Sequence, residues 1–362
     1  MKKQGYVPVW VKASLIFAVL SLLIYALCIN VRAAADFINS TVSVAIRFVM
    51  SCVTYLLPFS LFEILIILLP VLLVLLIVRL VRNGTTAKRR VRVLFSLVGV
   101  ISLILSSYIF MLGIGYHTTP IADRMGITDS ANINTDALYR TTLTVRNETN
   151  ALADKLEREG GVSVMPYSVD ELSARIVDAY ENMNDEYALV TNFTSRAKPL
   201  IFSTVMSDLR ITGIYSFFTG EANVNVEYPD YNLPFTVAHE LAHQRGVCRE
   251  NEANFVAFLV CISSNDDFIR YSGYLNLYEY LSSALYRADK SLYTEVREGL
   301  SELAFCDTAA SNAVYAEHKD SVLGKINERV NDTYLKLNGT QGTVTYGYVV
   351  RLAVSYYENK AE

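Results

Sequence analysis

The residues best suited to chemistry form a short cluster in the second half of this 362-residue chain. His239 and His243 are four residues apart, and Glu240 directly follows the first of them. On a helix, positions i and i+4 lie on one face, so both imidazoles can bind one zinc ion. Glu240 then lies beside the metal, where its carboxylate can act as general base for an activated water. The spacing therefore predicts a catalytic zinc site; the alternative is a solvated helix with unrelated histidines.

The surrounding residues predict where this helix begins and ends. Pro234 fits the first turn of a helix, and Gly246 can end it in a left-handed conformation. A tetrahedral zinc needs a third protein ligand, which a continuing straight helix would carry away from the metal. The chain reversal after Gly246 delivers Arg249, Glu250 and Glu252, from which the third ligand must come.

Two known families of zinc peptidases can be compared with this stretch. The metzincin pattern H-E-x-x-H-x-x-G-x-x-H would place Arg249 at the third-ligand position, and a guanidinium cannot bind a cation. The segment Glu250-Asn-Glu-Ala-Asn254 resembles instead the gluzincins, in which a Glu early in the next helix is the ligand. That resemblance implies that Glu250 is the third ligand, with Glu252 as the alternative, and that Asn254 orients a ligand histidine. The spacer before Glu250 is shorter than in most gluzincins, and Asn254 replaces the usual Asp.

The composition places part of the chain in lipid. Hydrophobic residues make up 52% and charged residues 19%, and the mean hydropathy is +0.27, which is too apolar for a soluble enzyme of this size. A net charge of −4 gives no basic excess, so a nucleic-acid partner is excluded. Five cysteines without C-x-x-C spacing predict neither a disulfide framework nor a cysteine zinc site.

Apolar residues gather before residue 114, which predicts two domains, 1–113 and 114–362. Stretches of about 20 apolar residues are long enough to cross a bilayer, and this length predicts three membrane-spanning helices at 9–29, 61–78 and 93–113. The apolar segment 41–58 contains Arg47, so we expect an interfacial or re-entrant helix there in preference to a fourth span.

The distribution of basic residues predicts the orientation of the spans. Between the second and third spans lie Arg79, Arg82, Lys88, Arg89, Arg90 and Arg92, whereas only Arg32 and Arg47 separate the first two. Cytoplasmic loops carry the excess of Lys and Arg. The N-terminus is therefore expected in the cytoplasm and the domain 114–362 outside it, in a multi-pass protein of the cell membrane.

The C-terminal domain is predicted to be mainly helical with a small sheet. Helices are expected at 136–158, 268–288, 290–303 and 346–357, and Ser168 with Glu171 forms a possible capping box before another. Strands are expected at 211–218 and 222–228.

Several residues are candidates for supporting roles around the zinc site. The strand 222–228 directly precedes the zinc helix, so Asn223 or Asn225 either contacts a peptide substrate or belongs to an internal strand. Cys248 is either an inhibitory thiolate or a buried free thiol. A donor to the developing oxyanion is expected from the downstream helices, although a structural role is favoured for each candidate: His318, Tyr271 and Tyr346.

The chain as a whole resembles a known group of proteins. The segments that carry the resemblance are the three N-terminal spans, LPFS before the second, GYHTTP after the third, and the stretch FFTGEANVNVEYPDYNLPFTVAHELAHQRGVCRENEANFVAFLVC. Together they are similar to a bacterial family of membrane-anchored zincin-like proteins catalogued as a domain of unknown function. The resemblance covers nearly the whole chain. It implies an α+β zincin-like extracytoplasmic domain of the gluzincin type that follows the membrane anchor in the sequence.

These observations predict a membrane-anchored zinc metallopeptidase that hydrolyses peptide bonds of a peptide or protein substrate, with the cell envelope as its source. An intramembrane protease is disfavoured because charged residues bracket the motif, and charge is costly in hydrocarbon. The alternatives are a catalytically silent zincin-fold sensor or binding protein for peptides or envelope components, and a membrane scaffold without metal. The scaffold leaves the histidine and glutamate cluster unexplained.

Overall fold

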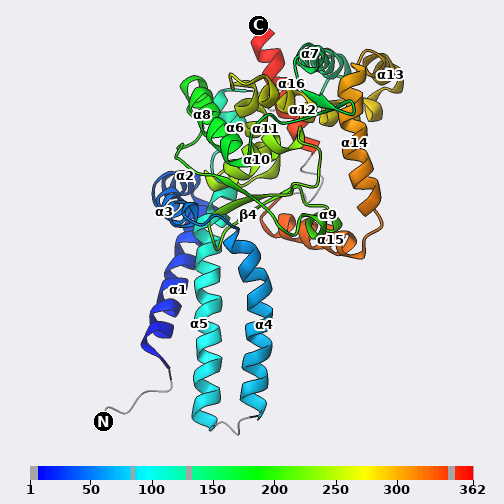
Figure 1. Cartoon of the computed structure of the whole chain (residues 1–362). Helices are drawn as coiled ribbons and strands as arrows, with labels where there is room; N and C mark the ends of the chain where they lie inside the picture. The colour runs from blue at the N-terminus through cyan, green and yellow to red at the C-terminus, as the bar shows by residue number, and fades with distance from the viewer. Residues whose placement is uncertain (1–6, 83–85, 128–132, 341–346, 362) are drawn as a thin grey trace. The chain divides into compact units, whose positions relative to one another are not determined.

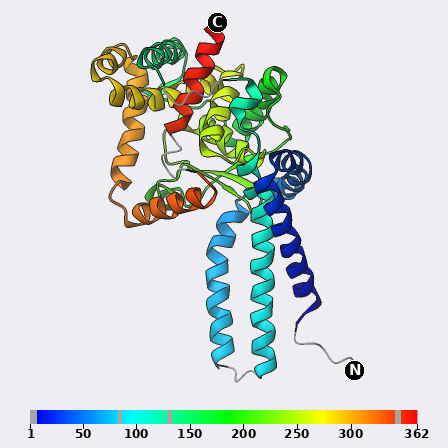
Figure 2. The ribbon, with the colours of Figure 1, turned by 180° about the vertical axis from the view of Figure 1, so that it is seen from behind.

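The structure of the protein is a computed structural model that describes residues 7–82, 86–127, 133–340 and 347–361 (Figures 1 and 2). The chain divides into two compact units. Unit 1 comprises residues 1–118 together with 216–221, and unit 2 comprises residues 119–215 and 222–362. The division near residue 118 lies close to the boundary expected at residue 113, whereas the return of 216–221 to unit 1 was not expected.

Unit 1 is built from apolar helices, as the composition predicted. Its elements are α1 (Val9–Asn30), α2 (Arg32–Ile38), the π-helical turn η1 (Asn39–Ser43), α3 (Val44–Tyr55), α4 (Leu61–Arg82), α5 (Ala87–Met111) and the 3-10 turn η2 (Gly113–His117). The described residues contain four helices long and apolar enough to cross a membrane: Val9–Asn30, Arg32–Tyr55, Leu61–Leu80 and Ala87–Met111. These helices indicate that the protein associates with a membrane.

The helix Arg32–Tyr55 departs from the expected segment 41–58, because it begins nine residues earlier and ends three residues sooner. Its length and composition make it a fourth candidate span, in the region where an interfacial or re-entrant helix was expected. Val31 is extended and separates it from α1. In both views α2 and α3 are seen end-on, while α1, α4 and α5 are seen from the side (Figures 1 and 2). The fourth helix thus runs across the direction of the other three.

Arg47 explains how a charged residue fits into this apolar helix. Its side chain is fully buried and donates to the backbone oxygens of Phe110 and Met111 at 3.3 and 3.4 Å, at the end of α5. It also donates to the backbone and side-chain oxygens of Asn39, both at 3.0 Å. A helix C-terminus carries unsatisfied carbonyls and a partial negative charge, which a guanidinium neutralises. The charge is therefore matched inside unit 1 and does not face lipid.

The segment 216–221 supplies the corresponding cap for α4. The buried carboxylate of Glu221 accepts hydrogen bonds from the backbone N–H groups of Leu61 and Phe62 at 3.0 and 2.8 Å. The Ser107 hydroxyl donates to the backbone oxygen of Phe217 at 2.8 Å. A carboxylate at a helix N-terminus satisfies free N–H groups and favours the helix dipole. The segment 216–221 is thus bonded into unit 1, although the residues before and after it in the sequence belong to unit 2.

Unit 2 is mainly helical with a small sheet, as predicted. Its helices are α6 (Ile121–Met125), α7 (Thr135–Ala153), α8 (Val169–Tyr187), α9 (Ser203–Asp208), α10 (Asn232–Gln244), α11 (Glu250–Ile262), α12 (Asp267–Ala288), α13 (Lys290–Glu298), α14 (Glu302–His318), α15 (Val322–Leu337) and α16 (Tyr348–Ala361). The capping box of Ser168 and Glu171 is present at the start of α8. Helix α11 is buried continuously from Glu252 to Cys261, which is the pattern of a helix at the centre of a core.

The strands are β1 (Arg158–Glu159), β2 (Val162–Ser163), β3 (Ala197–Pro199), β4 (Gly213–Ser216) and β5 (Glu221–Val224). β1 and β2 form a two-stranded antiparallel ribbon, and the second sheet has the order β3-β5-β4, with β3 parallel to β5. β5 is therefore the internal strand of the second sheet. Of the two alternatives for 222–228, a strand that contacts substrate and an internal strand, the structure has the internal strand. Asn223 and Asn225 are buried, and their side-chain amides donate to backbone oxygens of Ile214 and Ile211.

Candidate metal centre

Helix α10 carries the H-E-x-x-H pattern and ends where the sequence predicted. Gly246 has a φ of +95°, in the left-handed region that favours glycine. The N–H of Val247 then donates to the backbone oxygen of Ala242 at 3.0 Å, which closes the end of the helix. The next helix, α11, begins at Glu250. The short reversal between the two helices brings the first side chain of α11 back toward α10.

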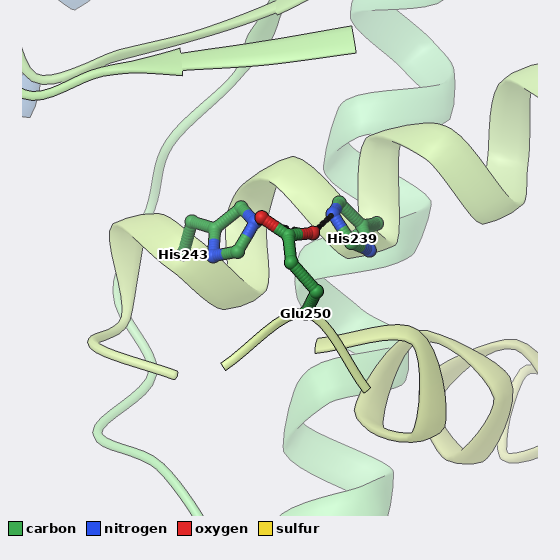
Figure 3. A group of neighbouring side chains, drawn as sticks. All are labelled: His239, His243 and Glu250. Atoms are coloured by element: carbon green, nitrogen blue, oxygen red, sulfur yellow. Dashed lines mark ion pairs between the residues drawn. The ribbon is translucent and has the colours of Figure 1, made fainter. Parts of the chain in front are cut away.

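Three potential ligand atoms converge at this reversal. The Glu250 carboxylate lies between the imidazoles of His239 and His243 (Figure 3). Glu250 Oε2 is 3.3 Å from His239 Nε2 and 3.7 Å from His243 Nε2. Within the described part of the chain, this is the group of His, Cys, Asp and Glu side chains that could hold a metal ion, with all ligand atoms within 4.8 Å of one another.

The hydrogen bonding of His243 leaves the correct nitrogen free for a metal. Its Nδ1 is 2.8 Å from the backbone oxygen of Val247, and only a protonated Nδ1 can donate to a carbonyl. In a neutral imidazole the lone pair then lies on Nε2, which faces Glu250. Nδ1 of His239 is buried and has no hydrogen-bond partner among the residues described. Backbone groups that fix the tautomer of a ligand histidine in this way are common around metal sites.

The donor set fits zinc. Two imidazoles and one carboxylate are the protein ligands of many catalytic zinc sites, in which a fourth position stays open for water or substrate. Atoms bound about 2.0 to 2.1 Å from a tetrahedral zinc lie about 3.3 to 3.4 Å from each other. The separations of 3.3 and 3.7 Å at Glu250 are close to that spacing. The third separation, between the two histidine nitrogens, is at most 4.8 Å, so the side chains would close around an ion by moving toward one another.

The electrostatics of the three residues have the character of a cation site. Burial alone would lower the pKa of His243, but the nearby Glu250 carboxylate outweighs it and raises that pKa to about 9. Burial alone would raise the pKa of Glu250, but His243 and His239 outweigh it and hold that pKa well below its usual range. A buried carboxylate that stays ionised beside two imidazoles favours a positive charge between them.

Glu240 is held next to this group by strand β4. Its side chain is only 4% exposed, and burial raises the pKa of its carboxyl. The backbone N–H of Tyr215 opposes that shift by hydrogen bonding to the carboxylate. A Cβ placed on Gly213 would lie 2.6 Å from Glu240 Oε1 and 2.7 Å from its Cγ. The absence of a side chain at Gly213 therefore makes the space that the carboxylate occupies.

The other acid of this stretch has a different partner. Glu252 Oε1 accepts hydrogen bonds from the backbone N–H of Ile121 at 3.1 Å and from Arg249 Nη1 at 2.9 Å. Of the two candidate third ligands, the structure thus brings Glu250 to the histidines and ties Glu252 to α6. Asn254 is buried, and within the described ranges its Nδ2 has no hydrogen-bond partner. The acceptor that orients a ligand histidine is the backbone oxygen of Val247.

The candidate oxyanion donors have varied surroundings. The Tyr271 hydroxyl is buried and donates to Asp307 Oδ2 at 2.5 Å, which gives it a structural role. His318 Nδ1 is 2.9 Å from Asp208 Oδ1, and Tyr346 lies outside the described residues. The Cys248 thiol is buried and donates to the backbone oxygen of Gly246 at 3.6 Å, as expected for a buried thiol.

Tyr280 was not anticipated from the sequence. Burial raises the pKa of its phenol, and the negative charges of Glu279 and Glu250 add to that effect. The Tyr280 phenol therefore lies within the electrostatic field of a candidate metal ligand and stays protonated. The only sequence signal was the tyrosine stripe of α12, which is equally typical of core packing.

Comparison with known proteins shows the family of the chain and names no zincin or metallopeptidase family. A model of a protein family of unknown function, DUF3810, matches residues 36–354. The chain belongs to this family. The match begins in the helix Arg32–Tyr55 and extends into α16, so it includes most of unit 1 and nearly all of unit 2. No curated protein and no solved structure shows significant similarity to the chain. No activity is assigned to the DUF3810 family.

Proposed function

We propose that this protein is a zinc-dependent metallopeptidase anchored in the membrane. The observation that supports this proposal is the convergence of His239, His243 and Glu250 beside the buried carboxylate of Glu240. A structural zinc site is closed by four protein ligands, whereas three ligands leave a position for water or substrate. A site that served structure alone would also have no use for a buried base at its side.

In the proposed mechanism, the three metal ligands and the base Glu240 have separate roles. His239, His243 and Glu250 would hold a zinc ion, which would acidify a bound water and polarise the carbonyl of the scissile peptide bond. The Glu240 carboxylate accepts the proton of the attacking water and then passes it to the leaving amine. Burial assists this role, because it raises the pKa of the carboxyl toward the range in which it can accept and release a proton. The N–H of Tyr215 keeps the carboxylate in place between these two events.

The zinc content of the purified full-length protein tests the metal assignment. His243→Ala removes one ligand, so we expect stoichiometric zinc in the wild type and only background zinc in the variant, because two ligands hold zinc far more weakly than three. His318→Ala is the matched control, since it removes a histidine from unit 2 outside the cluster and should keep its zinc. Stoichiometric zinc in a variant that lacks both His239 and His243 would contradict the proposal.

We also propose that α1, α4 and α5 are the membrane spans and that unit 2 is extracytoplasmic. The helix Arg32–Tyr55 runs across these three, and its Arg47 is matched inside unit 1, which suits a position along the membrane surface. Six basic residues lie at the end of α4 and the start of α5 and favour a cytoplasmic location for the connection between these helices. With the N-terminus in the cytoplasm, a fourth span would place this connection outside and unit 2 on the cytoplasmic side.

Reporter fusions in bacterial cells test this topology. Alkaline phosphatase fused after residue 362 is expected to be active, because the enzyme folds only outside the cytoplasm, and the same reporter fused after residue 83 is expected to be inactive. A green fluorescent protein at the same two positions is the reciprocal control. The opposite pattern, active after residue 83 and inactive after residue 362, is what four spans from a cytoplasmic N-terminus would give, and it would refute the orientation. Activity at neither position would show that α5 does not cross the membrane.

A further inference from the structure

The solvent-facing side of α15 carries a line of apolar residues. Val322, Ile326 and Val330 follow one another at intervals of four, and Leu323 and Leu337 lie beside them on the same face. All five side chains are exposed, Val330 at 60% and Leu337 at 82%. We call this set the α15 stripe. A stripe of large apolar residues that faces outward requires a partner, because isolated surface residues are common but a continuous line is not.

The opposite side of α15 attaches the helix to unit 2. Gly324 and Leu335 are buried, and the Asn327 amide donates to the backbone oxygen of Leu209 at 3.0 Å. Arg210, from the same turn, pairs with Glu328. The helix is therefore held through one face, and the α15 stripe does not belong to the core.

Basic residues border the α15 stripe along one flank. Lys325 precedes Ile326, Arg329 precedes Val330, and Lys336 precedes Leu337, so the three cations repeat with the spacing of the stripe. All three are exposed, although Lys336 also pairs with Asp332. An apolar face bordered by Lys and Arg is typical of helices that lie in the interface of a membrane, where the cations meet anionic headgroups.

A second exposed apolar group lies next to this helix. Ile201, Phe202 and Val205 are exposed around the start of α9, Ile201 at 77%, and α9 and α15 lie side by side in both views (Figures 1 and 2). Val226 is also exposed, and its N–H donates to the Ser203 hydroxyl at 3.1 Å, which joins it to the same group. In the chain, these residues lie on either side of the segment 216–221, which belongs to the membrane-associated unit.

We propose that the α15 stripe, together with the apolar group around α9, inserts into the surface of the bilayer in which unit 1 is embedded. The chain passes between the two units at 118–119, 215–216 and 221–222, so unit 2 is tied to a membrane anchor at three points. A lipid surface is thus joined to unit 2 through the chain itself and requires no encounter with a partner. A second copy of the chain would not explain the line of cations along the flank. The inference does not depend on the proposed peptidase activity.

Tryptophan fluorescence of the full-length protein in proteoliposomes tests the proposal. The chain has a single tryptophan, Trp10, which Trp10→Phe removes. In that background Ile326→Trp places the probe on the α15 stripe, and Val330→Trp is a second probe in case the first variant folds poorly. The matched control is Tyr286→Trp on α12, because Tyr286 is 48% exposed and Ile326 54% exposed. The vesicles contain phosphatidylglycerol and phosphatidylcholine, with or without bromine on the acyl chains.

Insertion predicts that both stripe probes emit at shorter wavelength than the control and lose fluorescence in brominated vesicles, while Tyr286→Trp loses none. A blue shift without quenching by bromine would overturn the proposal in favour of a protein partner, such as a second copy. Stripe probes that a soluble quencher reaches as readily as the control would overturn it in favour of a solvated helix. In the triple variant Lys325→Gln, Arg329→Gln, Lys336→Gln, weaker quenching supports the contact with anionic headgroups, and unchanged quenching refutes that contact.

Discussion

Glu240→Gln is expected to retain its zinc while peptide hydrolysis falls by about 10²- to 10⁴-fold, the range typical of losing acid-base assistance. The amide has nearly the shape of the carboxylate and can still accept a hydrogen bond from Tyr215 N–H. It cannot accept a proton from water. Because Glu240 is not one of the three converging ligands, metal binding and turnover should separate in this variant.

Glu250→Gln provides the matched comparison, since it is the same chemical change ten residues further along the chain. It removes a charged ligand from between the two histidines, so we expect zinc affinity to fall first and activity to fall with it. Excess zinc should restore part of the activity of Glu250→Gln and none of the activity of Glu240→Gln. Both variants are measured for zinc content and for cleavage of a quenched peptide library and of cell-envelope proteins.

Two results would contradict the mechanism. Full activity of Glu240→Gln would exclude this residue as the base. A wild-type protein that binds zinc and cleaves none of the peptides or envelope proteins would favour a silent zincin-like protein that binds peptides or envelope components. A wild-type protein without zinc would refute the metal site itself, so failure of the metal assignment and failure of the activity are distinguishable.

The central part of the site could be predicted because its geometry is local. The spacing of His239 and His243 alone places them on one helix face. Gly246 indicates the chain reversal that places Glu250 near both histidines. The choice between Glu250 and Glu252 was less direct, because it rested on resemblance. The structure separates them through Ile121, whose N–H binds Glu252 from 131 residues away. No sequence spacing encodes that contact.

The membrane unit shows the same division between local and distant effects. The apolar lengths of α1, α4 and α5 are read directly from hydropathy, and these helices are present. Arg47 looked like an interruption, because a charge without its partner is costly in an apolar helix. Its partners are the end of α5 and Asn39, and the helix Arg32–Tyr55 is therefore longer than the sequence suggested. The Glu221 cap of α4 could not be predicted either, because Glu221 is about 160 residues away from Leu61 and Phe62 in the sequence.

Gly213→Ala is expected to lower activity by about 10²-fold while leaving zinc in place, because a displacement of a catalytic group by about 1 Å can cost that much. The new Cβ would lie 2.6 Å from Glu240 Oε1 and 2.7 Å from Thr236 Cγ2, closer than such atoms can approach. The φ angle of Gly213 is not positive, so the backbone accepts alanine and the strain falls on the carboxylate. Overpacking of this kind also costs stability, typically about 1 to 3 kcal/mol.

Two controls separate the loss of position from the loss of stability. Gly273→Ala creates a similar collision, 2.5 Å from Cys261 Cβ in the contact of α12 with α11, so it should lower the thermal midpoint without lowering the activity of the folded protein. Gly347→Ala meets no atom within 4 Å and should change neither. In the Glu240→Gln background, Gly213→Ala should cause little further loss of rate, because both changes act on one carboxylate. Losses of rate that simply multiply in the double variant would show that Gly213 acts on something other than Glu240.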